Sequence, residues 1–312
     1  MKDRNANFGD VVGIVILNYN NAGYTLDCIE SILRFNTAPV RIVVVDNAST
    51  DGSVAALSGW LEQHPDTFTL LEAPSNGGYA RGNNIGLEYF DNDGDIDKVM
   101  ILNNDVLFTE DIIPVLSDFI DAHPEAGLVS PLLRCRDGHT PDSTCARRDC
   151  SIREIVWTYL LYFTDIAGIL SRFSNRRKML LTNPELLDKE CVGIELPSGS
   201  CMMIRKDLFR EIGWFDPNTF LYYEENILYR KLLAKGKQNY MLPGISCIHL
   251  GGVTTNKVNH SAQYMKASKA SGYYYAKHYR NLNLLQKVCL DCASGFFNIM
   301  VGIVKAVKKL RH

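Results

Sequence analysis

The stretch Val11-Val12-Gly13-Ile14-Val15-Ile16-Leu17 is an unbroken apolar run, and the polar residues Asn18-Tyr19-Asn20 follow it directly. A continuous run of this kind is typical of a parallel strand that is buried on both faces of a sheet. A turn-rich segment comes next, and a helical pattern then places four apolar residues on one face: Leu26, Ile29, Ile32 and Leu33. We therefore predict a strand followed by a helix at the start of the domain.

Three more mostly apolar runs are predicted as strands along the chain, at residues 41–45, 68–71 and 99–102. Strands that alternate with helices predict an α/β domain, in which a parallel sheet carries helices on both faces. Two of the runs end in polar clusters, Asp46-Asn47 and Asn103-Asn104-Asp105. Ligands bind at the carboxyl ends of strands in such sheets, so these clusters predict a binding edge.

The second half of the chain is less regular. Residues 134–190 are rich in Arg, Cys and aromatic residues, and we interpret them as an insertion. Regular patterning returns at 195–204, and a helix is predicted from about Tyr223 to Lys235 with Gly236 as its C-cap. A further strand is predicted over 240–248, and the chain beyond residue 260 is expected to be mostly helical.

The composition excludes several classes of protein. The chain has 312 residues, of which 46% are hydrophobic, and this content argues against a disordered chain. The formal net charge of −2 gives no overall electrostatic case for binding nucleic acid. The 9 cysteines include no CxxC pair, so we expect free thiols rather than a disulfide framework. A zinc site at Cys135, Cys145 and Cys150 is the alternative, but the spacing fits no common zinc motif.

The location is predicted from the lack of long apolar segments. The N-terminal residues 1–10 are polar and do not resemble a signal peptide. The longest apolar candidate, Ile155 to Leu170, is interrupted by Asp165 and is shorter than the ~20 residues that a transmembrane helix needs. We therefore expect a cytoplasmic, reduced location.

Asp105 and His249 are the candidate metal ligands. A carboxylate at the end of a buried strand, flanked by Asn104, can hold Mg²⁺ or Mn²⁺ against a diphosphate. His249 ends another predicted strand, where a ring nitrogen can complete the site. The alternatives remain open, because Asn and Asp also favour turns and a lone His is often structural.

Two further features suit a nucleotide. The segment from Asn76 to Asn84 contains Gly77 and Arg81 and enters a helix, so its N–H groups and the Arg81 guanidinium can meet phosphate. It is neither a P-loop nor the dinucleotide fingerprint, which weakens a dehydrogenase interpretation, and a tight turn is the alternative. Asp46 can accept a hydrogen bond from a pyrimidine imide and Tyr19 can stack on the base, although both can equally be structural.

Taken together and in order, these motifs resemble the family 2 glycosyltransferases of the GT-A fold, especially the rhamnosyltransferase-like branch. The resemblance covers about residues 10–255. It is carried by residues 15–20, 45–53, 76–80, 82–86, 102–105, 198–200, 213–216, 220–224 and 249–252.

The resemblance implies an organisation and a site. A GT-A catalytic domain would span 1–255, the insertion at 134–190 would face the membrane or the acceptor, and a helical C-terminal extension would span 256–312. The nucleotide-sugar contacts would be Asn18, Tyr19, Asp46, Asn76, Gly77, Arg81 and Asn104. Asp105 and His249 would hold Mn²⁺ or Mg²⁺. The pocket for the donor sugar and the acceptor would be lined by Ser198, Gly199 and Ser200.

The chain departs from the family pattern at the expected catalytic base. The family usually has a Glu-Asp pair and a second acid two places later, whereas this chain has Glu224-Glu225-Asn226-Ile227. The resemblance therefore implies Glu225 as the base, with Glu224 as the alternative. The added methylene of Glu225 requires a slightly deeper pocket or a shifted helix.

Two segments suggest a membrane surface. An apolar and aromatic stretch at 155–163 has Arg147, Arg148 and Arg153 before it and basic residues 172–178 after it. The C-terminus repeats this pattern, with apolar residues at 296–304 leading into basic residues at 305–311. Such segments are typical of interfacial helices on an anionic leaflet. Packing on the catalytic domain and a homo-oligomer contact are the alternatives.

We therefore expect an inverting glycosyltransferase on the inner face of the cytoplasmic membrane. It would move a sugar from a UDP- or dTDP-sugar to a hydroxyl of a lipid-linked glycan in cell-surface polysaccharide synthesis. A sugar nucleotidyltransferase, which would release pyrophosphate, is one alternative. A non-catalytic sugar- or lipid-binding relative is the other, because the acid cluster is altered.

Overall fold

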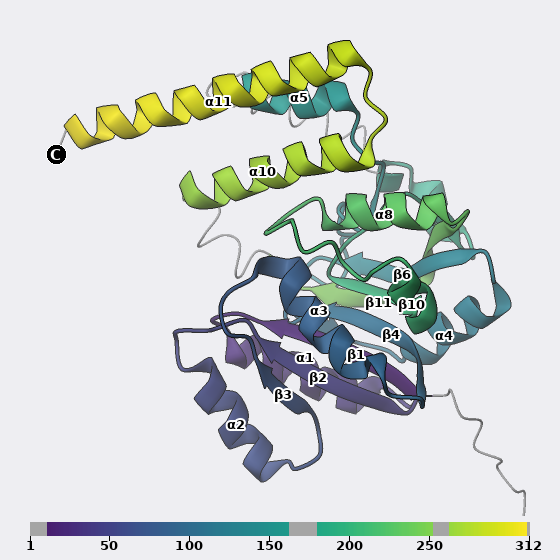
Figure 1. Ribbon diagram of the computed structural model, residues 1–312. Coiled ribbons are helices and arrows are strands. Elements are labelled where there is room, and N and C mark those ends of the chain that lie inside the picture. Colours follow the sequence, from purple (N-terminus) through teal and green to yellow (C-terminus); the bar gives the residue numbers. More distant parts are fainter. Residues whose placement is uncertain (1–10, 162–179, 252–261, 311–312) are drawn as a thin grey trace, which may run out of the picture.

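The computed structural model describes residues 11–161, 180–251 and 262–310 (Figure 1). Its centre is a 9-stranded sheet in the order β3-β2-β1-β4-β10-β6-β11-β5, with β8 paired to β11. The first strands in sequence are β1 (Val11–Asn18), β2 (Val40–Asp46), β3 (Thr69–Glu72) and β4 (Ile96–Asn103). They are mutually parallel and confirm the four predicted apolar runs as strands.

The other half of the sheet corrects the expectation of a parallel sheet. β10 (Cys201–Arg205) is antiparallel to β4, and β5 (Val106–Phe108) and β8 (Val192–Ile194) are antiparallel to β11 (Gln238–His249). The sheet is therefore mixed. Because β10 is antiparallel to β4, residues 198–200, which come just before β10, lie beside the end of β4.

Three strands of the sheet, β5, β6 and β8, had not been predicted from the sequence. β6 (Ala126–Arg134) lies between β10 and β11, although Pro131 argues against a central strand. β10 pairs with β6 at Val129 and not at Pro131, so the missing N–H of the proline costs no bond on that side. The register with β11 also shifts after Leu242, the partner of Pro131.

Helices cover both faces of the sheet. α1 (Ala22–Phe35), α2 (Ser53–Gln63) and α4 (Ile113–Ala122) contribute to the core cluster on one face. α3 (Gly78–Asp91), α7 (Lys206–Glu211) and α8 (Glu224–Ala234) contribute to the cluster on the other. α8 ends as predicted, with Gly236 just beyond it in the left-handed region at a φ of 69°.

A third group of helices lies over α8. In Figure 1, α5 (Ile152–Leu160) and α11 (Leu284–Leu310) run side by side above α10 (Ala262–Tyr279). Tyr159, Tyr275 and Phe297 are almost fully buried between them. The short elements β7 (Ala146–Arg147), β9 (Leu196–Pro197), η1 (Leu180–Thr182) and η2 (Pro184–Asp188) complete the described segment after β6. The helical extension is confirmed, and it packs on the region interpreted as an insertion.

The structure tests part of the predicted membrane segments. Residues 162–163, 172–178 and 311 lie outside the described residues. Among the described residues, α11 contains the segment Leu284–Ile303, which has a mean hydropathy of 1.3. By length and composition alone, this segment could cross a membrane. The expectation that no apolar segment reaches this length is therefore corrected.

Candidate functional site

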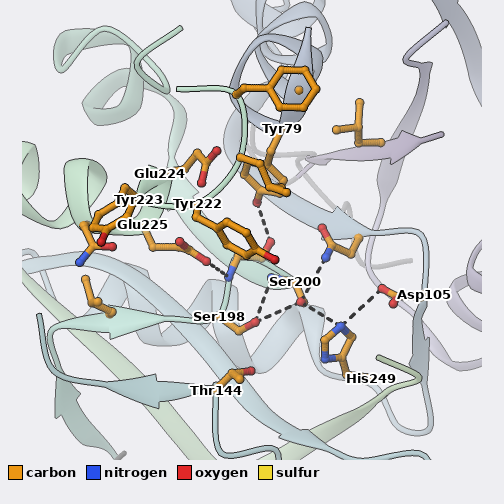
Figure 2. Close-up of a pocket in the computed structure, with 18 of the residues that line it drawn as sticks. Tyr79, Asp105, Thr144, Ser198, Ser200, Tyr222, Tyr223, Glu224, Glu225 and His249 are labelled. Carbon is orange, nitrogen blue, oxygen red and sulfur yellow. Dashed lines mark hydrogen bonds and ion pairs between the residues drawn. The ribbon is translucent and has the colours of Figure 1, made fainter. Parts of the chain in front are cut away.

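The carboxyl ends of β1 and β4 open into a cleft of about 600 Å³. Predicted site residues that line this cleft are Tyr19, Asn76, Asn104, Asp105, Ser198, Gly199, Ser200, Glu224, Glu225 and His249. Other residues, which had not been predicted as site residues, also line it, among them Tyr79, Thr144, Arg147, Arg148, Tyr222 and Tyr223. Figure 2 shows Glu225 and Asp105 on opposite sides of Ser198 and Ser200.

Asp105 and His249 are neighbours because of strand pairing. Asp105 lies in the turn before β5, and β5 pairs with the end of β11 so that Val106 is opposite His249. His249 Nε2 is 3.5 Å from Asp105 Oδ1, while its Nδ1 is 2.8 Å from Asp142 Oδ2. Burial alone would lower the pKa of His249, but its contacts with the two carboxylates raise that pKa to about 9.

The side chains of Asp105 and His249 together fit a divalent cation whose remaining ligands come from a bound substrate. Among the described residues, no three or more His, Cys, Asp or Glu are grouped to hold a metal by themselves. Asp105 and His249 form a converging pair in the cleft wall. Mg²⁺ in particular is usually bound by one or two carboxylates together with substrate phosphates, and Asp105 supplies one such carboxylate.

Asn18 and Asp46 lie behind the cleft rather than in its wall. Asn18 Nδ2 donates to Asp46 Oδ2 at 2.7 Å, and the backbone N–H of Ser49 donates to Asp46 Oδ1 at 2.8 Å. Asn104 Nδ2 in turn donates to Thr25 Oγ1 at 3.0 Å. Both oxygens of Asp46 therefore already accept hydrogen bonds, and the geometry shows these residues fixing the ends of β1, β2 and β4.

The glycine-rich segment also differs from the phosphate-binding arrangement that its sequence suggests. The N–H groups of Gly77 and Gly78 donate to Asn47 Oδ1 and Asn76 Oδ1, at 3.1 and 3.0 Å. Gly78 has a φ of +79°, and a Cβ there would lie 2.0 Å from the carbonyl oxygen of Phe220, so only glycine fits. Gly77 and Arg81 are not among the residues that line the cleft.

Arg81 is turned to the outer surface instead. It is exposed, and its Nε donates to the carbonyl of Pro217 at 2.8 Å. In this structure the segment is a tight turn that docks α3 on the loop before α8.

Glu224 and Glu225 form the first turn of α8, as predicted. The two residues before them, Tyr222 and Tyr223, have φ values of 69° and 71° in the left-handed region. Such a conformation costs on the order of 1–3 kcal/mol for each residue and is concentrated at functional sites. The Tyr223 ring stacks on Tyr275 of α10 with centroids 5.5 Å apart, which holds the strained segment in place.

The two carboxyl groups have different surroundings. Glu225 Oε1 accepts from the backbone N–H of Gly199 at 3.1 Å and lies 3.4 Å from Arg147 Nη2. Its carboxylate is therefore oriented by a backbone donor and a guanidinium. Glu224 is 5% exposed, and its Oε1 has no hydrogen-bond partner among the residues that the structure describes. Burial, and then the charge of Glu225, raise the pKa of Glu224 well above its ordinary value. The two neighbours therefore differ in burial and in hydrogen bonding, and only Glu225 has donors from the cleft wall.

Residues of the region 134–190 supply part of the site. Asp142 contacts His249, and Arg147 contacts Glu225 from β7, which pairs with β9. Asp149 is the anchor of this segment: its side chain is 2% exposed and accepts from residues of α8, of α10 and just beyond it. Its partners are Asn226, Arg230, Tyr275 and Arg280. The region is therefore part of the cleft wall.

Comparisons with known proteins agree with this geometry. A sequence model described as "Glycosyl transferase family 2" matches residues 13–213. The chain is 26% identical to the N-acetylglucosaminyl-diphospho-decaprenol L-rhamnosyltransferase of Mycobacterium tuberculosis (strain ATCC 25618 / H37Rv), over 86% of this chain and 87% of that protein. It is 23% identical to rhamnosyltransferase WbbL of Escherichia coli (strain K12), over 77% of this chain and 83% of that protein. The crystal structure of GalNAc-T7 with UDP, GalNAc and Mn2+ shares the fold, with a TM-score of 0.58 at 15% identity, over 90% of this chain and 54% of that chain.

Proposed function

We propose a function from one premise, which is that the chain belongs to glycosyl transferase family 2. Its fold is the GT-A fold, and the protein is a glycosyltransferase. The family match sets aside the alternative of a sugar nucleotidyltransferase. The observation that carries the finer proposal is that Glu225, Asp105 and His249 line one cleft. A base and a metal-binding pair that face the same space favour a catalytic enzyme over a non-catalytic relative.

The proposed substrates are a UDP- or dTDP-sugar and a lipid-linked glycan used in cell-surface polysaccharide synthesis. Both curated relatives described above are named as rhamnosyltransferases, which supports a deoxyhexose as the transferred sugar. The M. tuberculosis relative is named for a sugar linked to diphospho-decaprenol, which supports a lipid-linked acceptor. Tyr19, Asn76 and Asn104 line the cleft near the ends of β1 and β4 and are the proposed contacts of the nucleotide.

In the proposed reaction, a hydroxyl of the acceptor attacks the anomeric carbon of the donor sugar. The new glycosidic bond forms as the bond to the nucleoside diphosphate breaks, and the anomeric configuration inverts. Glu225 takes the proton of the hydroxyl as general base. The Gly199 N–H orients the Glu225 carboxylate, and Tyr79 Oη fixes that segment by donating to the Gly199 carbonyl at 2.6 Å.

Asp105 and His249 are the proposed ligands of Mn²⁺ or Mg²⁺. The Nδ1 of His249 faces Asp142, which leaves Nε2 toward Asp105. A carboxylate behind a ligating histidine is the usual arrangement at metal sites, because it fixes the ring and its tautomer. A bound ion would stabilise the negative charge that develops on the leaving diphosphate.

A panel of nucleotide sugars tests this function. In the presence of Mn²⁺, UDP- or dTDP-sugars are expected to raise the melting temperature of the full chain by roughly 5 °C at a concentration ~100 times the Kd. GDP- and CMP-sugars are expected to shift it less, and transfer should release a nucleoside diphosphate. A larger shift with GDP- or CMP-sugars, or release of pyrophosphate from a nucleoside triphosphate, contradicts the proposal.

We also propose that α11 lies on the inner face of the cytoplasmic membrane as a peripheral anchor. One face of the helix is buried against α5 and α10 through Leu290, Ala293, Phe297 and Val301. The opposite face exposes apolar residues, namely Leu284, Leu285, Val288, Phe296, Ile299 and Ile303. Because one face is occupied from Leu290 to Val301, the geometry favours a helix that lies in the interface over one that crosses the bilayer.

Replacing two residues of the exposed face tests the anchor. The double variant Ile299→Gln with Ile303→Gln is expected to lower the fraction of protein that sediments with anionic vesicles by ~10-fold, since it removes apolar area without touching the buried face. Leu33→Gln on α1 is the matched control. Leu33 is 52% exposed, and α1 packs on the central sheet rather than on α11. Equal sedimentation of the double variant and the unchanged protein would show that α11 is not the anchor.

A further inference from the structure

The wall of the cleft that carries Glu225 is also basic. Arg147 and Arg148 both line the cleft, and they are consecutive residues at the end of β7. Arg147 is engaged by Glu225 and by the carbonyl oxygens of Thr144 and Pro197. Arg148 is exposed, and among the described residues no carboxylate pairs with its guanidinium. One of the two cations is therefore available for an anion that enters the cleft.

The backbone of Arg148 is fixed on both sides. Arg147 pairs with Leu196 in the two-stranded β7–β9 sheet. The next residue, Asp149, is the buried anchor of α8 and the C-terminal helices. The backbone that carries this cation is therefore positioned in the cleft wall before a ligand binds, which lowers the ordering cost of binding.

We propose that Arg148 binds the diphosphate of a lipid-linked acceptor. This inference rests on the proposed glycosyl transfer and names the acceptor's chemical class at the site. The donor's own diphosphate is expected at the other side of the cleft, next to Asp105 and His249. The acceptor hydroxyl has to reach Glu225, and Arg148 lines the same cleft next in sequence to Arg147, which contacts Glu225.

The surface formed by α5 and α11, beyond Arg148, fits the hydrocarbon part of an amphiphilic acceptor. The chain runs from Arg148 into α5, which begins at Ile152 and packs on α11. Trp157 on α5 is 56% exposed, and α11 presents its apolar face outward. A cation in the cleft followed by an apolar surface matches a molecule in which a diphosphate joins a sugar to a hydrocarbon chain. Arginine suits this group because its guanidinium forms paired charge-assisted hydrogen bonds with phosphate oxygens.

Two acceptors and three variants of the full chain test the proposal. The first acceptor carries its sugar on a polyprenyl diphosphate, and the second carries the same sugar on an alkyl group without phosphate. Arg148→Gln is expected to lower the ratio of kcat/KM for the first acceptor over the second by ~10-fold or more. Arg148→Lys keeps the charge and should retain most of the ratio. Arg153→Gln is the matched control, because Arg153 is exposed on α5 and outside the cleft lining.

Other results would overturn the inference. If Arg148→Gln lowers kcat/KM equally for both acceptors, or weakens nucleotide-sugar binding in calorimetry while the ratio is unchanged, then Arg148 serves the donor diphosphate or the fold. If the unsubstituted enzyme binds a nucleotide sugar but transfers to neither acceptor, the proposed function fails first and this inference fails with it. The unsubstituted enzyme's transfer rates thus separate the two failures.

Discussion

Glu225→Gln is expected to lower kcat by ~10²-fold or more while leaving the affinity for the donor almost unchanged. An acceptor hydroxyl is a poor nucleophile, so its attack needs a carboxylate that takes the proton. Glutamine has the same size, and its Oε1 can still accept from the Gly199 N–H, so the fold of the loop is retained. The measurement is kcat at saturating donor and acceptor, with the donor Kd determined by calorimetry.

Glu224→Gln is the matched variant on the neighbouring residue. Burial raises the pKa of Glu224, which favours its neutral acid form, and an amide resembles a neutral acid. A smaller loss of turnover is therefore expected from Glu224→Gln than from Glu225→Gln. Near-normal turnover in Glu225→Gln together with a collapse in Glu224→Gln would assign the base to Glu224.

Asp105→Ala is expected to abolish both the Mn²⁺-dependent binding of nucleotide sugar and turnover. Asp105 is the one carboxylate of the proposed pair, and its loss leaves His249 as a single ligand. Calorimetric titrations of nucleotide sugar with and without Mn²⁺ measure the effect, and the melting temperature of the free variant checks its fold. Unchanged turnover in this variant, or full activity of the enzyme in excess EDTA, contradicts the metal role.

Asp142→Asn extends this test to the residue behind His249. Loss of the carboxylate that orients His249 is expected to weaken Mn²⁺ affinity by ~10–100-fold. Asp118→Asn is the control, because it makes the same change on the exposed surface of α4, outside the cleft lining. An equal Mn²⁺ affinity in both variants would show that Asp142 does not support the metal site.

The first strands and their polar ends could be predicted because the information is local. Each of the runs that became β1, β2 and β4 is continuous and apolar, and its end is marked by polar residues. Tyr19, Asn104 and Asp105 line the cleft where these ends meet. The resemblance to the family added Glu225, which no periodicity identifies.

The missed features depend on partners that are distant in the sequence. Arg147 is 78 residues from Glu225, and Asp142 is 107 residues from His249. No local pattern distinguishes Arg147 from a basic residue that flanks a membrane segment. β6 was missed because Pro131 is tolerated only through the way β10 and β11 pair around it.

The turn at Gly78 shows why some residues were placed incorrectly relative to the cleft. A glycine-rich segment that enters a helix has the same sequence pattern whether its N–H groups meet phosphate or protein. Here the N–H of Tyr79 donates to the Phe220 carbonyl at 3.1 Å, and that carbonyl comes from the loop before α8. Contacts of this kind exist only after the chain has folded, so the sequence alone left both alternatives open.

The buried carboxylate of Asp149 joins segments that leave the ribosome at different times. Its arginine partners are Arg230 in α8 and Arg280 beyond α10. Translation adds about 5–20 residues per second, so the ~50 residues between these arginines take roughly 3–10 s to synthesise. In that interval β1, β2, β3 and β4 can already pair, since all of them lie before residue 104. The nascent chain is therefore expected to form these four strands first. A product that ends before Tyr275 would keep them while lacking two of the four partners of Asp149, namely Tyr275 and Arg280.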